Sequence, residues 1–193
     1  NPSTVSFTNP ASPATTVNGL VTGAYRFVWT VANGLCADSK DTVQITINPQ
    51  SVPGSLSASI TVCAIANSGT LSLTGYTGSI LNWQSSTDNG ATWNTINNTS
   101  ASLNFSNLNT TTQYRATVQS GVCAPLFSNI ITVTVLQTVS IANAGADQVL
   151  CNAASASLAA ATPSSGTGSW TAVTANPSTV SFTNPASPAT TVN

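Results

Sequence analysis

The sequence predicts an all-β fold made of tandem β-sandwiches in a repeat array, and three observations support this prediction. Hydrophobic and polar residues alternate along several short stretches, which is the pattern of strands with one buried face. Turn-forming residues separate these stretches at intervals typical of a sandwich. The first eighteen residues, NPSTVSFTNPASPATTVN, return unchanged as residues 176–193. An identical stretch at a fixed offset is the mark of a tandem repeat.

The strand prediction depends on runs rich in Val, Ile, Thr and aromatic residues, which suit a pleated surface. Four runs alternate clearly: AYRFVWTV at 24–31, DTVQITI at 41–47, YRATV at 114–118 and ITVTV at 131–135. Turns are expected at Asn33-Gly34, Asp88-Asn89-Gly90 and Ser120-Gly121. The alanine-rich segment 151–161 has no helical period and is expected to hold a strand around Leu158.

The composition argues against several classes of function. Charged residues are 4% of the chain, the net charge is −1, and Glu and His are absent. Such a chain has no basic surface for nucleic acid and no long apolar run for membrane insertion. General acid–base catalysis favours His or a tuned Glu, so we expect no enzyme, no cofactor and no metal site. Asp38 and Asp41 are interpreted as a solvated turn, with a calcium contact as the alternative.

The repeat divides the chain into three parts. Because Asn1 recurs as Asn176, one period covers residues 1–175. Residues 48–137 are expected to form one complete sandwich. Residues 1–47 would be the second half of a split sandwich, and residues 138–193 the first half of the next one. The two modules are related, because each contains a Cys, then a Trp, an aromatic strand and a second Cys in the same order and at similar intervals.

The four cysteines are spaced as two similar pairs. The interval from Cys63 to Cys123 equals the interval from Cys151 to the copy of Cys36 that the next period would supply. Metal binding is the weaker interpretation, because no CxxC motif and no His occurs. We therefore predict a disulfide between Cys63 and Cys123 within the chain. Cys36 and Cys151 are predicted to bond with neighbouring repeats, Cys151 with the next copy of Cys36.

The sequence resembles a known group of surface proteins. GAYRFVWTVANGLCADSKDTVQITI and ADQVLC resemble the PKD-like or Ig-like modules of giant secreted adhesins of gliding bacteria, the Bacteroidota. WQSSTDNGATW with TTTQYRATVQSGVC is similar to the Ig-like modules that alternate with them. Cys123 lies nine residues after Tyr114, unlike the second Cys of antibody domains. The expected bridge would therefore pin an outer strand to a loop at the end of the sandwich.

The resemblance implies a structural function. Such modules form the stalks of large adhesins, so we expect an extracellular, cell-surface fibre repeat that extends a tip away from the cell, as in gliding motility. Its partners would be neighbouring repeats of the same polymer, joined head to tail. The alternative is a weak carbohydrate- or protein-binding module that acts by avidity, with glycans as candidate partners.

Three sets of side chains are singled out. The aromatic residues of the alternating strands are expected in the core rather than on a sugar-binding surface: Trp29, Trp83, Tyr25, Tyr114 and Trp170. The SSTDNGATW segment is similar to a box on the hairpins of sialidase propellers, so Asp88 and Gly90 should fix a hairpin turn, with sugar contact as the alternative. Thr42 fits the Asp-Ser/Thr-apolar pattern of O-glycosylation in the Bacteroidota.

Overall fold

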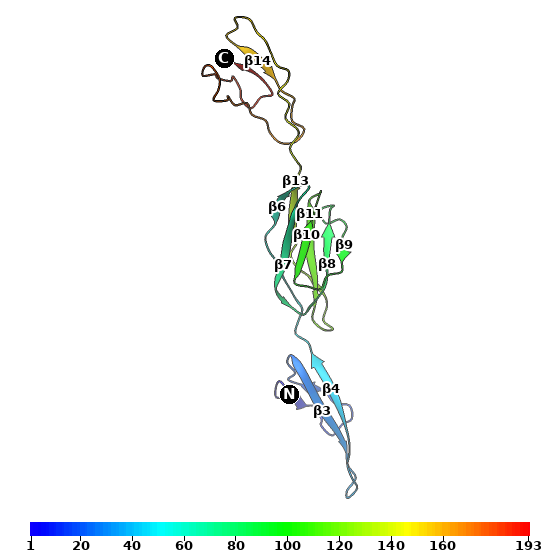
Figure 1. The fold of residues 1–193 in the computed structure, drawn as a ribbon. Helices are drawn as coiled ribbons and strands as arrows, with labels where there is room; N and C mark the ends of the chain where they lie inside the picture. Colours follow the sequence, from blue (N-terminus) through cyan, green and yellow to red (C-terminus); the bar gives the residue numbers. More distant parts are fainter.

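The computed structural model describes residues 1–193 and is all-β (Figure 1). Three units follow one another along an elongated molecule. We call residues 1–47 the N-terminal unit, residues 52–136 the central sandwich and residues 138–193 the C-terminal unit. The linker, residues 48–51, joins the first two. No helix is long and apolar enough to cross a membrane.

Fifteen strands make up these units. The N-terminal unit contains β1 (Ser6–Phe7), β2 (Val17–Asn18), β3 (Gly23–Val31) and β4 (Ser39–Ile47). The central sandwich contains β5 (Val52–Leu56), β6 (Ile60–Cys63), β7 (Ser68–Thr77), β8 (Ser79–Ser86), β9 (Asn94–Ile96), β10 (Ser102–Ser106), β11 (Thr112–Gln119), β12 (Leu126–Phe127) and β13 (Ile131–Leu136). The C-terminal unit contains β14 (Ala156–Ala159), around Leu158 as predicted, and β15 (Ala189–Val192).

Two sheets face each other in the central sandwich. One has the strand order β10-β7-β5, and the other has the order β6-β13-β11-β8-β9, with β12 added to β11. The pairs are antiparallel except for β6 and β13, which run parallel. Along β13, Ile131, Val133 and Val135 are buried while the threonines between them are not. The alternating pattern therefore places one face of each strand in the core between the sheets.

Trp83 is the largest fully buried side chain of this core. It is 0% exposed and pairs across the sheet with Ala116. Its indole N–H donates a hydrogen bond to the carbonyl oxygen of Ser100 at 2.9 Å, so the one polar atom of the ring is satisfied. Tyr114 is also buried in this core. The predicted burial of both residues is confirmed.

The predicted turn at Asp88 and Gly90 is formed between β8 and β9. The Asp88 carboxylate accepts hydrogen bonds from the backbone N–H of Thr92 at 2.9 Å and from the hydroxyls of Thr92 and Ser86. These donors, the Thr92 hydroxyl first, lower the pKa of Asp88 from its ordinary value of 3.8 to about 2. Gly90 has a φ of 88°, a backbone conformation that is strained for any residue with a side chain. The aspartate and the glycine together fix the hairpin.

The two terminal units contain only two-stranded sheets, β1-β2 and β3-β4 in the N-terminal unit and β14-β15 in the C-terminal unit. In the N-terminal unit, β3 and β4 pair over their full nine residues and end in a turn at Asn33–Cys36. Tyr25 is fully buried as predicted, with its hydroxyl hydrogen-bonded to Ser3 and to the backbone of Val21. The predicted burial of Trp29 is wrong, because its side chain is 43% exposed. Nothing in this chain covers the end of the strand where Trp29 lies.

The predicted disulfide between Cys63 and Cys123 is also wrong, because all four cysteines are free. Cys63 pairs with Leu136, where the chain leaves the sandwich. Cys123 lies beyond β11 at the opposite end, where its thiol donates to the carbonyl oxygen of Pro49 at 3.3 Å. The eight residues of β11 span roughly 26 Å. A disulfide requires Cα atoms within about 7 Å, so the parallel pairing of β6 with β13 separates the two thiols.

Candidate functional site

The repeated eighteen residues fold into the same hairpin at both ends of the molecule. In the first copy, the backbone N–H of Thr8 donates to Thr16 O at 3.0 Å, and that of Ser12 donates to Asn9 O at 3.2 Å. The second copy makes the corresponding bonds, from Thr183 to Thr191 O at 2.9 Å and from Ser187 to Asn184 O at 3.2 Å. Phe7 pairs with Val17, and the equivalent Phe182 pairs with Val192. We call this element the shared hairpin.

The first copy of the shared hairpin packs on one face of β3 and β4. The ring of Phe7 contacts the ring of Phe27 edge to face, with centroids 5.4 Å apart. Between this hairpin and the two strands lies an open hollow with apolar walls, lined among others by Pro13, Phe27, Trp29 and Val43. The exposure of Trp29 is part of this hollow. An exposed hollow with several apolar side chains in its wall is a candidate surface for contact with another protein segment.

The second copy uses a different edge of the shared hairpin. Its strand β15 pairs antiparallel with β14, in the register Leu158 to Thr190. The residues equivalent to β15 in the first copy, 14–17, pair on one side only, with the segment around β1. The edge that β14 occupies in the C-terminal unit is therefore open in the N-terminal unit.

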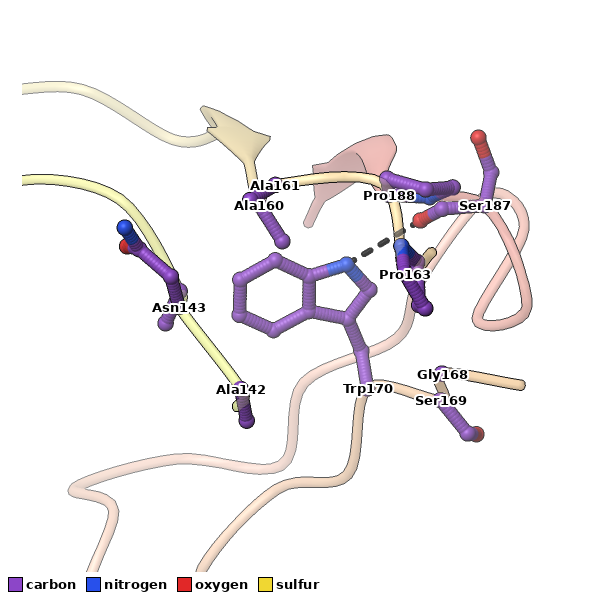
Figure 2. A pocket seen from close by; sticks show the side chains of 11 residues that line it. Ala142, Asn143, Ala160, Ala161, Pro163, Gly168, Ser169, Trp170, Ser187 and Pro188 are labelled. Atoms are coloured by element: carbon purple, nitrogen blue, oxygen red, sulfur yellow. Dashed lines mark hydrogen bonds between the residues drawn. The ribbon is translucent and has the colours of Figure 1, made fainter. Parts of the chain in front are cut away.

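Trp170 is held against the second copy. Its indole N–H donates to Ser187 O at 3.1 Å, and its backbone N–H donates to Pro185 O at 2.8 Å. Figure 2 shows the ring between Ala160, Ala161 and Pro188 on one side and Ala142 and Asn143 on the other. This pocket is apolar and open, and Trp170 is only half-buried. The prediction that Trp170 is a core residue is thus met only in part, because its side chain is not fully buried.

The two open faces are complementary around the shared hairpin. Trp170 rests on Pro185, Ser187 and Pro188 in the second copy. The equivalent residues of the first copy, Pro10, Ser12 and Pro13, form part of the wall of the hollow beside Phe27 and Trp29. The surface of the hairpin that Trp170 contacts in the second copy is thus the surface that faces the hollow in the first copy. Overlaying one hairpin copy on the other would bring β14 to the open edge at residues 14–17.

The remaining predicted residues lie apart from this site. Thr42 is exposed on β4, where its backbone N–H is bonded to Asp41. On the central sandwich, the guanidinium of Arg115 lies between the rings of Trp93 and Phe127, 4.0 and 3.9 Å from their centroids. Partial burial lowers the pKa of Arg115 from its ordinary value. One face of Trp93 is therefore already covered by Arg115.

Comparison with known families adds one finding. Residues 52–137 match a domain of unknown function (DUF8696). The matched range coincides with the central sandwich and leaves both terminal units outside. No curated protein matches the chain.

Sequence reasoning missed the shared hairpin as a structural element. The eighteen residues contain only short alternations, and their strands are two to four residues long. The available signal was the pair of asparagine–proline steps, Asn9-Pro10 and Asn184-Pro185, which are typical of turns. Each opens a loop in which the asparagine side chain accepts the backbone N–H two residues later.

Proposed function

We propose that the chain is a structural repeat of an extracellular bacterial fibre, in which Ig-like and PKD-like sandwiches alternate. In this array, the C-terminal unit of one period and the segment equivalent to residues 19–47 of the next period form one sandwich around a single shared hairpin. The single observation that carries the proposal is the shared hairpin itself. It has one structure and two different sets of neighbours, and the two sets occupy different surfaces of it.

The free energy of burying the open faces supports a neighbouring copy of the chain as the partner that covers them. A strand pair without a covered face is marginal in water. Joining the units would remove from water the apolar surface of Phe27, Trp29, Val43 and Trp170. Burying one such large side chain contributes about 1.5–3 kcal/mol. A second copy of the chain has the required shape because the covering unit is already attached to the same hairpin sequence.

The composition and the shape suit a spacer. The units lie end to end, so each period adds length rather than bulk (Figure 1). Charged residues are 4% of the chain, which makes contacts between neighbouring units insensitive to salt. An identical repeat favours a mechanical part, because a spacer needs length more than variety of surface. On the resemblance to giant adhesins, we place the fibre at the cell surface, where it would carry a tip outwards.

The test is a joined chain in which residues 138–193 are followed directly by residues 19–47. It contains each proposed part of the split sandwich once. We expect one cooperative thermal transition for the joined chain and no cooperative transition for either part alone. Substitution of Phe27 by Ala should lower the transition, whereas Thr42→Ala, on the exposed side of β4, should leave it unchanged. A joined chain without a cooperative transition contradicts the proposal.

The alternative function is a weak glycan- or protein-binding repeat. The guanidinium of Arg115 stacks between the rings of Trp93 and Phe127. Only its Nε–H donates a hydrogen bond, to Gln84, so its other N–H groups are free to bind a ligand. Binding of the whole chain to a glycan array would favour this function, particularly if Arg115→Ala abolished it. The spacer function predicts no binding.

A further inference from the structure

Two turns in the chain are structural equivalents, and each ends in a cysteine. In the turn Asn33–Cys36, the backbone N–H of Cys36 donates to Asn33 O at 3.1 Å. In the turn Ser120–Cys123, the N–H of Cys123 donates to Ser120 O at 2.9 Å. The second residue of each is a glycine at positive φ, 59° for Gly34 and 52° for Gly121. Each turn closes the hairpin end of a long strand, β3 or β11.

The turn at Cys123 is hydrogen-bonded to the linker that enters the central sandwich. The backbone N–H of Ser120 donates to the Ser51 hydroxyl at 3.0 Å. The Cys123 thiol donates to Pro49 O, and Gly121 lies so close to the Asn48 side-chain amide that an added Cβ would displace that amide. The cysteine is thus held two residues past Ile47, the last residue of β4.

The turn at Cys36 has no such partner in this chain. A Cβ built on Gly34 would meet nothing within 4 Å, and Leu35 is fully exposed. The linkers after β13 and after β4 share one feature, although the Ser140 hydroxyl in the former donates to Ser165 O at 3.2 Å. A serine lies four residues beyond each strand end, Ser51 after Ile47 and Ser140 after Leu136. In the array, the turn that ends at Cys36 of the next period would therefore contact residues 137–140.

Cys63 already lies at the start of that segment. It pairs with Leu136 in the parallel register of β6 and β13, and the N–H of Ala64 donates to Leu136 O at 2.7 Å. By the equivalence of the turns, the next copy of Cys36 would lie beside Thr138, two residues further along. Two residues of extended chain span roughly 7 Å, so both cysteines would lie against the same short segment, and the bond requires their Cα atoms to come within about 7 Å of each other across it. Both thiols face solvent, since both residues are exposed.

We propose that Cys63 bonds Cys36 of the next period, and that Cys151 bonds Cys123 of the next period, so that one disulfide crosses every junction between units. This inference rests on the proposed array. It replaces the expected pairing of Cys151 with Cys36, because the equivalent pair Cys63 and Cys123 lies at opposite ends of a finished sandwich. Each bond forms as two thiols lose two protons and two electrons to a disulfide oxidant, which is reduced to two thiols.

These bonds would make the fibre mechanically continuous. Residues 36–63 run from the free end of the N-terminal unit, along β4 and the linker, to the exit of the central sandwich (Figure 1). Residues 123–151 take the equivalent course from the central sandwich through β13 into the next unit. With a disulfide at every junction, tension would pass along these two segments. The remaining residues of each sandwich would then carry no load and would not unfold.

The test uses a two-period chain, in which residues 19–193 follow Asn193 once more. It is oxidised by glutathione disulfide at low concentration, and the monomer is digested without reduction and analysed by mass spectrometry. We expect two bonds, of Cys63 to Cys36 and of Cys151 to Cys123, with four of the eight thiols free. Cys63→Ser in the first period should abolish one bond. Cys36→Ser in the first period, which has no preceding unit, should abolish neither.

Other outcomes overturn the inference and separate it from the proposed function. Two free thiols would remain if Cys63 bonded Cys123 and Cys151 bonded Cys36. That result would contradict the junction pairing but would not contradict the proposed array. Eight free thiols in a chain whose joined sandwich unfolds cooperatively would also contradict the junction bonds alone. Eight free thiols together with an unfolded joined sandwich would contradict both proposals.

Discussion

Trp83 and Trp170 make the same hydrogen bond in two different units. Each indole N–H donates to the carbonyl oxygen of the serine seventeen residues later, at 2.9 Å for Trp83 and 3.1 Å for Trp170. The surroundings differ, because Trp83 is fully buried in the central sandwich while Trp170 is half-buried. The C-terminal unit therefore fixes its tryptophan by the same hydrogen bond as the central sandwich does, but leaves the ring half-buried.

The neighbour of Trp83 indicates what Trp170 lacks. Trp83 lies across the sheet from Ala116, two residues after Tyr114 on β11. The equivalent strand of the split sandwich is β3, where Phe27 follows Tyr25 at the same distance. Tyr25 and Tyr114 each pair with an isoleucine on the following long strand, Ile45 and Ile131. We expect Phe27 of the next period to lie beside Trp170.

The first prediction compares two tryptophans in the 193-residue chain. Trp83→Ala should lower the free energy of unfolding of the central sandwich by about 3–5 kcal/mol, because it leaves a large cavity and an unpaired carbonyl at Ser100. Trp29→Ala should lower the free energy of unfolding of the N-terminal unit by about 1 kcal/mol or less, because the side chain is already 43% exposed. Denaturant titrations measure both. Equal losses would contradict the assigned burial.

The second prediction concerns acid stability and Asp88. Its folded pKa, about 2, lies below the ordinary 3.8. The carboxylate thus stabilises the fold above pH 4, and this contribution is lost as the pH falls from about 4 to about 2. Asp88→Asn should lower the melting temperature at pH 6, and this difference should largely disappear at pH 2. Asp147→Asn, in the C-terminal unit, is the control. An Asp88→Asn variant with the pH profile of the parent would rule out this role.

The third prediction separates two equivalent glycines. Gly121→Ala should loosen the contact between the turn and the linker, because the new Cβ would displace the Asn48 side chain and would be strained at a φ of 52°. Limited proteolysis should then cleave residues 48–51 faster. Gly34→Ala meets no neighbour and should cost only the strain of a positive φ, about 1–2 kcal/mol, with no change in cleavage at the linker. Unchanged cleavage in Gly121→Ala would contradict the grip of the turn on the linker.

The sequence alone was sufficient for the strands with clear alternation. The runs at 24–31, 41–47, 114–118 and 131–135 all lie in strands, because period two records which side chains will share a face. The same pattern failed for Trp29. Alternation reports which side chains share a face of a strand, and it does not report whether another segment of the chain covers that face.

The cysteine pairing failed for a different reason. Equal spacings indicated two equivalent pairs, but spacing does not say at which end of a sandwich each thiol lies. That depends on strand direction. Because β6 runs parallel to β13, Cys63 is carried to the exit beside Leu136, away from Cys123. A parallel neighbour brought in by a crossover leaves no local signature in the sequence.

The most direct test of the split sandwich is hydrogen exchange of the two-period chain, measured on peptides from residues 23–47. This segment occurs twice in that chain, once at the N-terminus without a partner and once beside a C-terminal unit. A split sandwich predicts two equal populations of each peptide, one exchanging as in the 193-residue chain and one strongly protected. A single population that exchanges as fast as in the 193-residue chain would contradict it.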